Sequence, residues 1–493
     1  MMIFLQRVEL RRDLVSGGTQ VASVLNNYGR KLLIFVLCVG LMGAAPLATA
    51  SAATVPPGPS TLMEQYGFQV DAGGDHTCVV MRGWIGKCWG NGNSGALGDL
   101  NDLNAYNKPR SFGFNGTFYS VSSGNSHTCA ITTDSKVTCW GDNTNGQLGG
   151  QSQMPFSPVT LANLQGVSLL SSGGDHTCAI VGDSIVKCWG RTYNSPRAPS
   201  WVPDTIRSIT NPRKLTSGAS HTCALESSGF VKCWGDNQSG QTGTQTSNTL
   251  AGVRVPVDNS VDISAGDTFS CSLLLSGSVS CWGGNQFNQL GNGTLTNSAR
   301  PVPVTGVSGA VAISSGHSHT CALIEDGSVK CWGSNLRGQL NGLRTVSGNE
   351  AQTVAGIRNA VAISAGGDHT CASFASGSIK CWGDNRNGQI AKISSTKILG
   401  ATFVEGFKKL KVEATIGRSA NLSSISTNIT LTSESAIKFS FQWYVSGKAI
   451  KGATKSTYKT KRSDIGKEFY VKITCSKSGF PKLVINSPTL ALA

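Results

Sequence analysis

The feature that most constrains this chain is a segment with two cysteines and a Trp-Gly pair that recurs seven times between residues 76 and 383. In the copy HTCALIEDGSVKCWG, residues 319–333, the cysteines lie ten positions apart and Trp-Gly follows the second one. A short apolar run, a turn at Asp326-Gly327 and a second run rich in Val and Trp are typical of a β-hairpin. The equal spacing then predicts a register in which Cys321 faces Cys331, His319 faces Gly333 and Leu323 faces Val329.

This register brings the two cysteines of each hairpin within reach of a disulfide. Opposed residues at a non-hydrogen-bonded position have Cα atoms roughly 4.5 Å apart, at the short end of the range that a disulfide accepts. Closing a loop of about ten residues contributes about 3 kcal/mol by the chain-entropy estimate, before strain is subtracted. We therefore predict seven disulfides: Cys78–Cys88, Cys129–Cys139, Cys178–Cys188, Cys223–Cys233, Cys271–Cys281, Cys321–Cys331 and Cys371–Cys381.

The spacing between repeats predicts the fold class. Successive repeats begin 45 to 51 residues apart, the range of propeller blades and of solenoid units. We expect a third strand before each hairpin, as at Ala310 to Ser315, and a fourth after it, as at Pro301 to Thr305. Seven units of four strands predict an all-β chain with a seven-bladed β-propeller, which leaves only short sheet edges. The repeat count permits closure within one blade or by a strand shared between the two ends.

The repeat resembles that of a known family. The cycle SxGxxHTCAL, GSVKCWG and NxxGQLG resembles the repeat of the regulator of chromosome condensation family, whose members form seven-bladed propellers, and the resemblance covers residues 66–406. Both cysteines of the hairpin replace residues that are not cysteine in the nuclear members, which favours an oxidising compartment. The nuclear members act as exchange factors for a small nuclear GTPase, an activity that we do not expect of an exported chain.

The start of the chain is consistent with export. Arg30-Lys31 and an apolar run from Leu32 to Ala45 precede two A-x-A motifs at residues 48–52, a pattern typical of a cleaved secretory signal. The run is short for a membrane span, which disfavours a retained anchor. We expect a signal peptide with a long n-region at 1–52, a linker at 53–65, the propeller at 66–406 and a basic immunoglobulin-like β-sandwich at 407–493. The protein is then secreted or on the surface of a bacterium.

The C-terminal segment carries most of the net charge. The stretches FQWYVSGKAIKGATKSTY and SDIGKEFYVKIT resemble a bacterial immunoglobulin-like repeat, with Trp443 in the core and Asp464-x-Gly466 at a corner. From residue 407 onward 15 Lys and Arg stand against 4 Asp and Glu, a net +11. An anionic envelope polymer or lipid surface is the expected partner, a solvated basic face is the alternative, and nucleic acid is disfavoured because no recognition motif is present. The odd cysteine, Cys475, is a buried thiol or an intermolecular link.

Repeated polar residues are interpreted as structural. Six repeats have a histidine two positions before the first cysteine, whereas the fifth has Phe269, so the position is expected to need a flat ring beside a glycine rather than a lone pair or a proton. Loops such as DNTNGQLG have the oxygen-rich look of calcium loops but lack the terminal glutamate of an EF-hand, which favours ordinary turns. No catalytic, cofactor or metal motif is found, so we expect no enzyme activity and no cofactor.

Places where the repeat breaks are the candidate ligand-binding sites. Tyr, Arg and Trp, which are enriched at binding hot spots, occur in the first and third repeats outside the shared pattern. The alternative is that these side chains are packed lids over blade edges. The candidates are Trp84, Tyr106, Arg110, Tyr193, Arg197 and Trp201.

These observations favour an exported binding scaffold. The propeller would bind a protein or glycan through non-repeating loops, and the basic domain would associate with the envelope. One alternative is a secreted inhibitor, because some secreted bacterial propellers with this repeat block β-lactamases; aromatic residues clustered on one rim would favour it. A second is a polysaccharide-active enzyme, which would need Asp, Arg and Tyr from several blades in one cleft.

Overall fold

The structure, a computed structural model, describes residues 68–81, 85–99, 103–114, 116–151, 156–191, 200–245, 248–342, 350–391, 399–404, 412–418, 424–431, 438–476, 483–487 and 489–491. The chain divides into two compact units, Met1–Ala52 and Ala53–Ala493, and every described residue lies in the second. The predicted signal segment and linker therefore lie outside the described residues. Within these ranges, no helix is long and apolar enough to cross a membrane.

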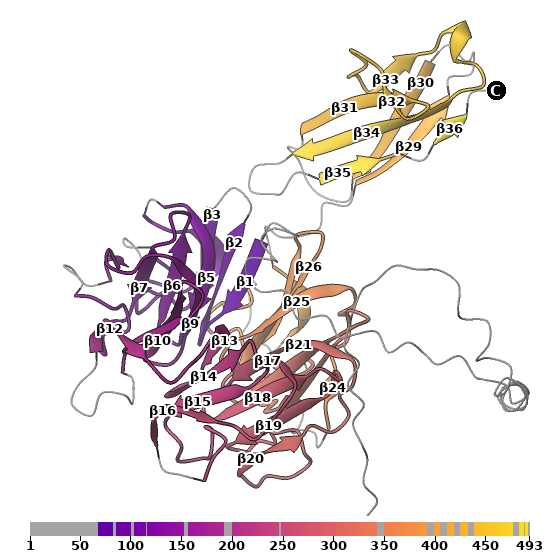
Figure 1. The fold of residues 1–493 in the computed structure, drawn as a ribbon. Helices are drawn as coiled ribbons and strands as arrows, with labels where there is room; N and C mark the ends of the chain where they lie inside the picture. Colours follow the sequence, from indigo (N-terminus) through magenta and orange to yellow (C-terminus); the bar gives the residue numbers. More distant parts are fainter. Residues whose placement is uncertain are drawn as a thin grey trace, which may run out of the picture. The chain divides into compact units, whose positions relative to one another are not determined.

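Seven four-stranded antiparallel sheets form the blades of the propeller (Figure 1). Blade 1 comprises β1 (Phe68–Ala72), β2 (His76–Met81), β3 (Ile85–Gly90) and β4 (Tyr106–Ser111); blade 2 comprises β5 (Phe118–Ser123), β6 (His127–Thr132), β7 (Val137–Gly141) and β8 (Val159–Thr160). Blade 3 comprises β9 (Val167–Ser172), β10 (His176–Val181), β11 (Ile185–Gly190) and β12 (Ser200–Ile206); blade 4 comprises β13 (Pro212–Ser217), β14 (His221–Glu226), β15 (Val231–Gly235) and β16 (Thr249–Arg254).

The remaining blades follow the same order from the innermost strand outward. Blade 5 comprises β17 (Ser260–Ala265), β18 (Phe269–Leu274), β19 (Val279–Gly283) and β20 (Ser298–Pro303); blade 6 comprises β21 (Ala310–Ser315), β22 (His319–Ile324), β23 (Val329–Gly333) and β24 (Gln352–Thr353). Blade 7 comprises β25 (Ala360–Ala365), β26 (His369–Phe374), β27 (Ile379–Gly383) and β28 (Leu399–Phe403). The outermost strand of blade 5 begins at Ser298 rather than at the predicted Pro301.

The register within each hairpin is the predicted one. In blade 6, His319 pairs with Gly333, Cys321 with Cys331 and Leu323 with Val329. All seven hairpins contain a disulfide between cysteines ten residues apart, with Cα atoms 4.0 to 4.1 Å from each other. The bridged cysteines are buried, so each disulfide lies inside the molecule between neighbouring sheets.

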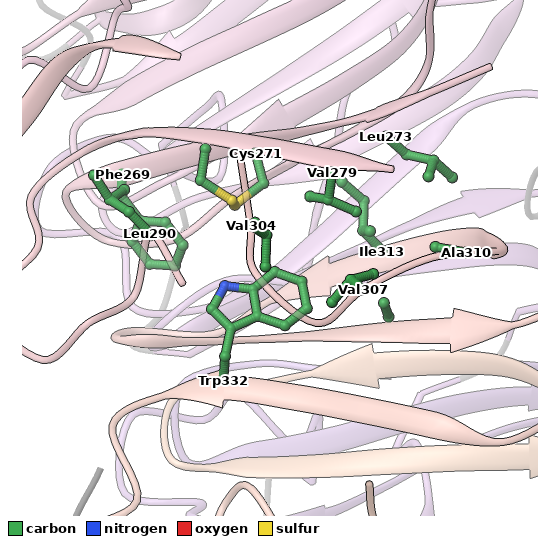
Figure 2. Close-up of a cluster of buried hydrophobic side chains, with 12 residues drawn as sticks. Phe269, Cys271, Leu273, Val279, Leu290, Val304, Val307, Ala310, Ile313 and Trp332 are labelled. Carbon is green, nitrogen blue, oxygen red and sulfur yellow. A yellow bond between two sulfur atoms is a disulfide. The ribbon is translucent and has the colours of Figure 1, made fainter. Parts of the chain in front are cut away.

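The tryptophan of each repeat fills the core of the preceding blade. Trp332 of blade 6 lies beside the Cys271–Cys281 disulfide of blade 5 and packs with Val304 and Val307 (Figure 2). The same arrangement closes the ring, because Trp89 of blade 1 packs in the core of blade 7. A single blade cannot bury its own faces, so burial of one large aromatic per interface couples the blades.

The ring closes without an exchanged strand among the described residues. Each sheet is built from one continuous stretch of chain, and blade 1 meets blade 7 through its own inner strands. At this junction the backbone N–H of Ala72 donates to Ser364 Oγ at 2.9 Å, and the indole N–H of Trp89 donates to the carbonyl of Gln389 at 2.8 Å. Of the two modes of closure that the repeat count permits, the structure has the one within single blades.

A circle of backbone hydrogen bonds joins the turns between the first and second strands of the blades, which we call the inner turns. In blade 6 the N–H of His317 donates to the carbonyl of Gly367 in blade 7, and equivalent bonds of 3.0 to 3.3 Å link all seven blades. The glycine that begins each inner turn lies against the next blade. A Cβ on Gly316 would lie 2.0 Å from the carbonyl oxygen of Gly366, which explains the glycine in SxGxxH.

Two further sheets follow the propeller in sequence, between residues 412 and 491. One comprises β29 (Val412–Arg418), β30 (Ser424–Leu431) and β33 (Thr457–Lys459); the other comprises β32 (Lys448–Ala449), β31 (Lys438–Val445), β34 (Glu468–Ser476) and β35 (Leu483–Asn486), with β36 (Leu490–Ala491) paired to β34. A 3-10 turn, η1 (Arg462–Asp464), precedes β34. Trp443 is fully buried in a cluster with Phe469 and Val471, as predicted. The side chain of Cys475 lies outside the described ones.

Candidate ligand-binding face

The loop after the third strand carries the NxxGQLG motif and begins beside the inner turn of its own blade. We call it the GQ loop and number its positions 1 to 8 from the residue after Trp-Gly; in blade 2 it is residues 142–149. The N–H of Asp142 donates to the carbonyl of Ser126 in the inner turn at 2.9 Å, and the other blades repeat this bond. Inner turns and GQ loops therefore form one end of the propeller, the GQ face, whereas the hairpin turns form the other end.

The recurring Asn and Gln side chains of the GQ loop bond the backbone of their own loop. In blade 2, Asn143 Oδ1 accepts the N–H of Leu148 at 3.0 Å, and Gln147 Oε1 accepts the N–H of Asn145 at 2.9 Å. The same two bonds occur in blades 4 to 7. Asp142 accepts from Thr144 and from the side chain of Gln147, which agrees with a turn rather than a calcium loop. In the described part of the chain, no group of His, Cys, Asp and Glu could hold a metal ion.

Position 6 of the GQ loop bonds the loop to the next blade. The carbonyl of Gln147 accepts both the indole N–H of Trp189 at 2.9 Å and the hydroxyl of Thr177 at 3.0 Å. Both bonds recur at position 6 of blades 1, 4, 6 and 7, and the tryptophan bond recurs at Gln289 of blade 5. Positions 2 and 7 are thus occupied with holding the loop, and position 6 with joining it to the next blade.

The repeat histidines complete this interlock, and here one expectation is wrong. His127 Nε2 lies 2.8 Å from Thr177 Oγ1, and because that hydroxyl donates to Gln147, the imidazole must donate its Nε2 proton. Burial lowers the pKa of His127 to about 3, so the ring is neutral. The position therefore does use a proton for His76, His127, His221, His319 and His369, whose hydroxyl partners each donate to a GQ-loop carbonyl. In blade 5, where Phe269 stands, Thr320 bonds Ser315 Oγ at 3.0 Å instead.

Two positions of the GQ loop remain for a ligand. Position 3 is exposed and position 4 is half-buried or exposed in every blade that has the motif. In blades 1, 2 and 4 these positions hold small or amide side chains. In blades 5 to 7 they include larger apolar and cationic side chains, Phe287, Leu336, Arg337 and Arg386, together with the amides Gln286 and Asn387. Among the accessible, variable side chains of the GQ loops, the large apolar and cationic ones therefore occur on three neighbouring blades, 5 to 7.

The inner turns of blades 2, 5 and 6 add polar side chains at the channel mouth. The second residue of the inner turn is Gly or Ala in four blades, but it is Asn125, Asp267 and His317 in blades 2, 5 and 6. His317 Nε2 lies 3.2 Å from Asn125 Oδ1 and 3.9 Å from Asp267 Oδ1. Burial raises the pKa of Asp267, and the nearby His317 moderates this rise.

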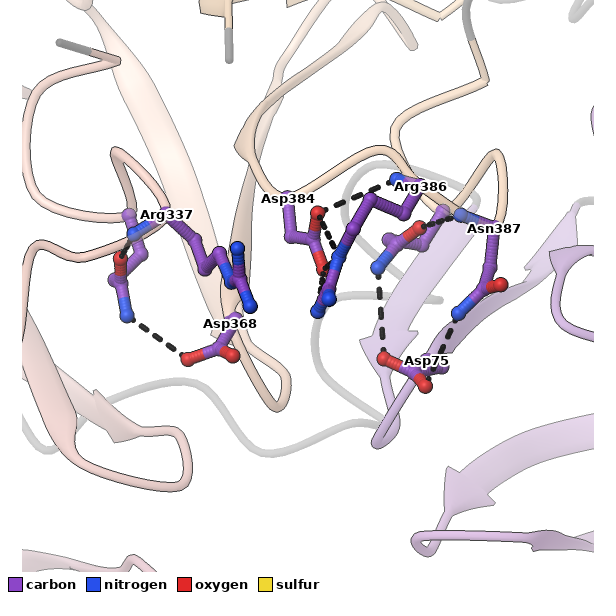
Figure 3. A network of polar contacts seen from close by, with 8 residues as sticks. Asp75, Arg337, Asp368, Asp384, Arg386 and Asn387 are labelled. Atoms are coloured by element: carbon purple, nitrogen blue, oxygen red, sulfur yellow. Dashed lines mark hydrogen bonds and ion pairs between the residues drawn. The ribbon is translucent and has the colours of Figure 1, made fainter. Parts of the chain in front are cut away.

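A polar network spans blades 6, 7 and 1 on this face (Figure 3). Asp368 accepts from the side chain of Gln339 at 2.9 Å, and Asp75 accepts from Asn387 at 3.1 Å. Although burial raises the pKa of Asp384, the ion pair and hydrogen bonds with Arg386 outweigh it and hold the pKa below its ordinary value. The described members of this network include no tyrosine, so the Asp, Arg and Tyr combination of a polysaccharide-active site is not assembled there.

Behind the mouth lies a central channel of about 1110 Å³ lined by the seven innermost strands. Its wall is built from side chains that cap the backbone of the next blade; Ser122 Oγ, for example, accepts the N–H of Ser172 at 2.9 Å. Six blades use Ser or Thr at this position, whereas blade 1 uses Asp71, which accepts the N–H of Ser123 at 2.5 Å. Burial raises the pKa of Asp71 to about 6.

The residues chosen from the breaks in the repeat are not brought together. Trp84, Tyr193 and Arg197 lie outside the described residues. Tyr106 is buried in blade 1, and the guanidinium of Arg110 stacks on its ring at 3.7 Å. Trp201 is 39% exposed and its ring lies over Gly146 of blade 2.

Aromatic residues on one rim, which would favour an inhibitor, are also not found in the described part. The exposed aromatic residues Trp201, Phe287 and Phe403 belong to blades 3, 5 and 7, no two of which are neighbours. The aromatic group that does form packs Phe112, Phe114 and Phe118 against the buried Trp140. Sequence reasoning missed positions 3 and 4 of the GQ loop because they lie inside the repeat. The available signal was their variability, since they are the two x positions of NxxGQLG.

Comparisons with known proteins agree with this architecture. Regulator of chromosome condensation (RCC1) repeats match residues 88–131, 118–147, 134–180, 213–241, 261–289, 276–323, 310–339 and 360–389. The structure of Prp20p from Saccharomyces cerevisiae, described together with its binding to Gsp1p and histones, is similar with a TM-score of 0.61 and 19% identity, over 70% of this chain and 88% of that one.

Two further structures are similar. Yeast RCC1 (Prp20) bound to Kap60 has a TM-score of 0.59 and 18% identity, over 74% of this chain and 90% of that one. Human WBSCR16 has a TM-score of 0.56 and 20% identity, over 61% of this chain and 85% of that one. No curated protein matches the chain in sequence. The chain thus contains RCC1 repeats, and they fold into an RCC1-like β-propeller with a disulfide in every blade.

Proposed function

We propose that the protein is an exported scaffold that binds a partner protein on the GQ face of blades 5 to 7. The observation that carries this proposal is the pattern of positions 3 and 4, which are the accessible, variable side chains in an otherwise interlocked loop. Leu336 is 53% exposed and lies between Phe287 of the preceding blade and Arg386 of the next. Exposed apolar side chains beside arginine are typical of protein interfaces, which favours a protein over a glycan.

Export is supported by the buried disulfides and by the N-terminal pattern. Seven disulfides within hairpins fit an oxidising compartment. N-terminal sequencing of the protein purified from its source is expected to start at Ser51 or Ala53, after one of the A-x-A motifs. A start at Met1 or Met2 would contradict cleavage.

The basic C-terminal domain is proposed to associate with an anionic partner of the envelope. Most of its described Lys and Arg side chains are exposed, whereas the acidic Asp464 is buried. Such a domain attracts polyanions through long-range electrostatics, and salt weakens that attraction. The two domains would then hold a partner protein at the envelope.

Paired substitutions at opposite ends of the propeller test the binding face. Residues 53–493, immobilised as bait for envelope and secreted fractions of the source organism, are expected to retain one protein at high salt. Leu336→Ser is expected to weaken this retention at least tenfold, because an exposed leucine at the centre of an interface contributes about 1.5 kcal/mol or more when buried.

The matched control is Leu275→Ser. Leu275 is 52% exposed and lies in the hairpin turn of blade 5, at the opposite end of the strands. It should leave retention unchanged. If Leu275→Ser releases the partner while Leu336→Ser does not, the GQ face is not the binding surface.

A further inference from the structure

The turn between β33 and β34 holds one apolar side chain out in solvent. Asp464 is buried and accepts the N–H of Lys461 at 2.9 Å and the hydroxyl of Tyr458 at 3.3 Å, while its carbonyl accepts the N–H of Lys467 at 3.1 Å. Gly466 follows with a φ of +80°, a conformation that suits glycine. This fixed turn leaves the intervening Ile465 62% exposed, the largest exposure of a bulky apolar side chain among the described residues of this domain.

Cationic residues flank this isoleucine in sequence, and another lies at the same end of the domain. Lys461, Arg462 and Lys467 are exposed on either side of it. Lys448 lies at that end as well, because it pairs with Val445, which in turn pairs with Phe469 at the start of β34. Within residues 445–476 the acidic residues are the buried Asp464 and the exposed Glu468. We call Lys448, Lys461, Arg462, Ile465 and Lys467 the basic tip.

We propose that the basic tip docks on an anionic lipid bilayer, with the cations at the headgroups and Ile465 entering the interface. A polysaccharide or another soluble polyanion would use the cations but would give no reason for an apolar side chain held outward at their centre. At a bilayer the same side chain gains from burial, and each cation near an anionic surface adds attraction. This inference rests on the proposed association of the C-terminal domain with an anionic partner, and it names that partner's chemistry.

Vesicle sedimentation tests the proposal. Residues 53–493, which form a compact unit apart from the apolar N-terminal segment, are mixed with vesicles of phosphatidylcholine alone or with phosphatidylglycerol. Binding is expected only with phosphatidylglycerol, and it should weaken as salt is added. The double substitution Arg462→Gln and Lys467→Gln is expected to lower affinity about 25-fold, at roughly fivefold for each cation. Ile465→Ser is expected to lower it about five- to tenfold.

Two controls keep the inference falsifiable. Lys472→Gln removes an exposed cation in the middle of β34, opposite Gln442, and should change vesicle affinity less than twofold. Binding of each variant to alginate beads is measured in parallel. If Ile465→Ser binds vesicles as tightly as the unsubstituted chain, or if Lys472→Gln loses as much as the tip variants, docking by the tip is wrong.

The same experiment separates this inference from the proposed function. If the chain binds alginate as tightly as it binds vesicles, and Ile465→Ser does not change that binding, the partner is a soluble polyanion. This result overturns the lipid inference but keeps the anionic association. Binding to neither surface would overturn both. Partner capture by the propeller depends on Leu336 and is unaffected by either result.

Discussion

Acidification is expected to unfold the propeller within about two pH units below the ordinary histidine pKa of 6.5. Burial lowers the pKa of six histidines in the folded chain, to about 4 for His76 and His176 and to about 3 for the other four. The unfolded chain therefore binds more protons. The stability from these groups is fully present above pH 6.5 and is lost as the pH falls toward the folded values.

The expected slope is steep because the six groups act together. At about 1.4 kcal/mol per group and pH unit, six histidines lower the free energy of unfolding by about 8 kcal/mol per unit. Asp71 acts in the opposite direction, since burial raises its pKa to about 6 and the folded chain binds its proton first. Burial also raises the pKa of Asp175, Asp267 and Asp368, so these carboxyl groups offset a further part of the histidine slope. Four such carboxyl groups against six histidines still leave a net loss of stability as the pH falls. Denaturant unfolding at a series of pH values measures the slope, and a pH-independent stability between 7 and 5 would contradict the buried neutral histidines.

His176→Phe provides a matched variant, because blade 5 already has phenylalanine at this position. The partner hydroxyl of Thr222 lies 3.4 Å from Ser217 Oγ and can use it as Thr320 uses Ser315. The variant should lower the slope by about 1.4 kcal/mol per pH unit. Its free energy of unfolding should therefore fall less between pH 8 and pH 5 than that of the unsubstituted chain.

The second large effect is expected at the circle of inner turns. Gly316→Ala would place a Cβ 2.0 Å from the carbonyl oxygen of Gly366 and 2.4 Å from the ring of His319. Relief requires blades 6 and 7 to move apart, which breaks the bond from His317 N–H to the carbonyl of Gly367. We expect a loss of about 3 kcal/mol or more in the free energy of unfolding, measured by denaturant titration at pH 8.

Gly356→Ala separates this steric effect from the general cost of replacing glycine. Gly356 has a φ of +76° and no atom within 4 Å of the position of an added Cβ. Its substitution should cost only the strain of that conformation, about 1 kcal/mol. Equal losses for the two variants would show that the circle does not depend on close approach of the blades.

The repeat made most of the fold predictable. The constant spacing of the cysteines set the hairpin register. Side chains of a strand alternate between the two faces of the sheet, so a slip by one residue would place the two cysteines of a hairpin on opposite faces. The period of the repeat then indicated four strands per unit. The mode of closure was not predictable, because it depends on how β1 meets β25 and β26 in space rather than on the number of repeats.

The candidate site was less predictable for a physical reason. Tyr106 and Arg110 look unusual in sequence, yet they stack on each other inside blade 1. Leu336 and Arg386 look like ordinary members of a repeat, and only the structure shows that position 3 is exposed while position 6 of the same loop bonds the next blade. The proton donated by the repeat histidines was missed because Phe269 suggested that the position needs only a flat ring.

Photo-crosslinking in the source organism tests whether the GQ face binds a partner protein. A photoreactive amino acid is placed in the full chain at Leu336 on the GQ face or at Leu275 on the opposite end, two positions of nearly equal exposure at 53% and 52%. We expect a crosslink from position 336 to one partner protein and none from position 275. A crosslink to that partner from position 275 alone, or with equal yield from both positions, would contradict binding at the GQ face.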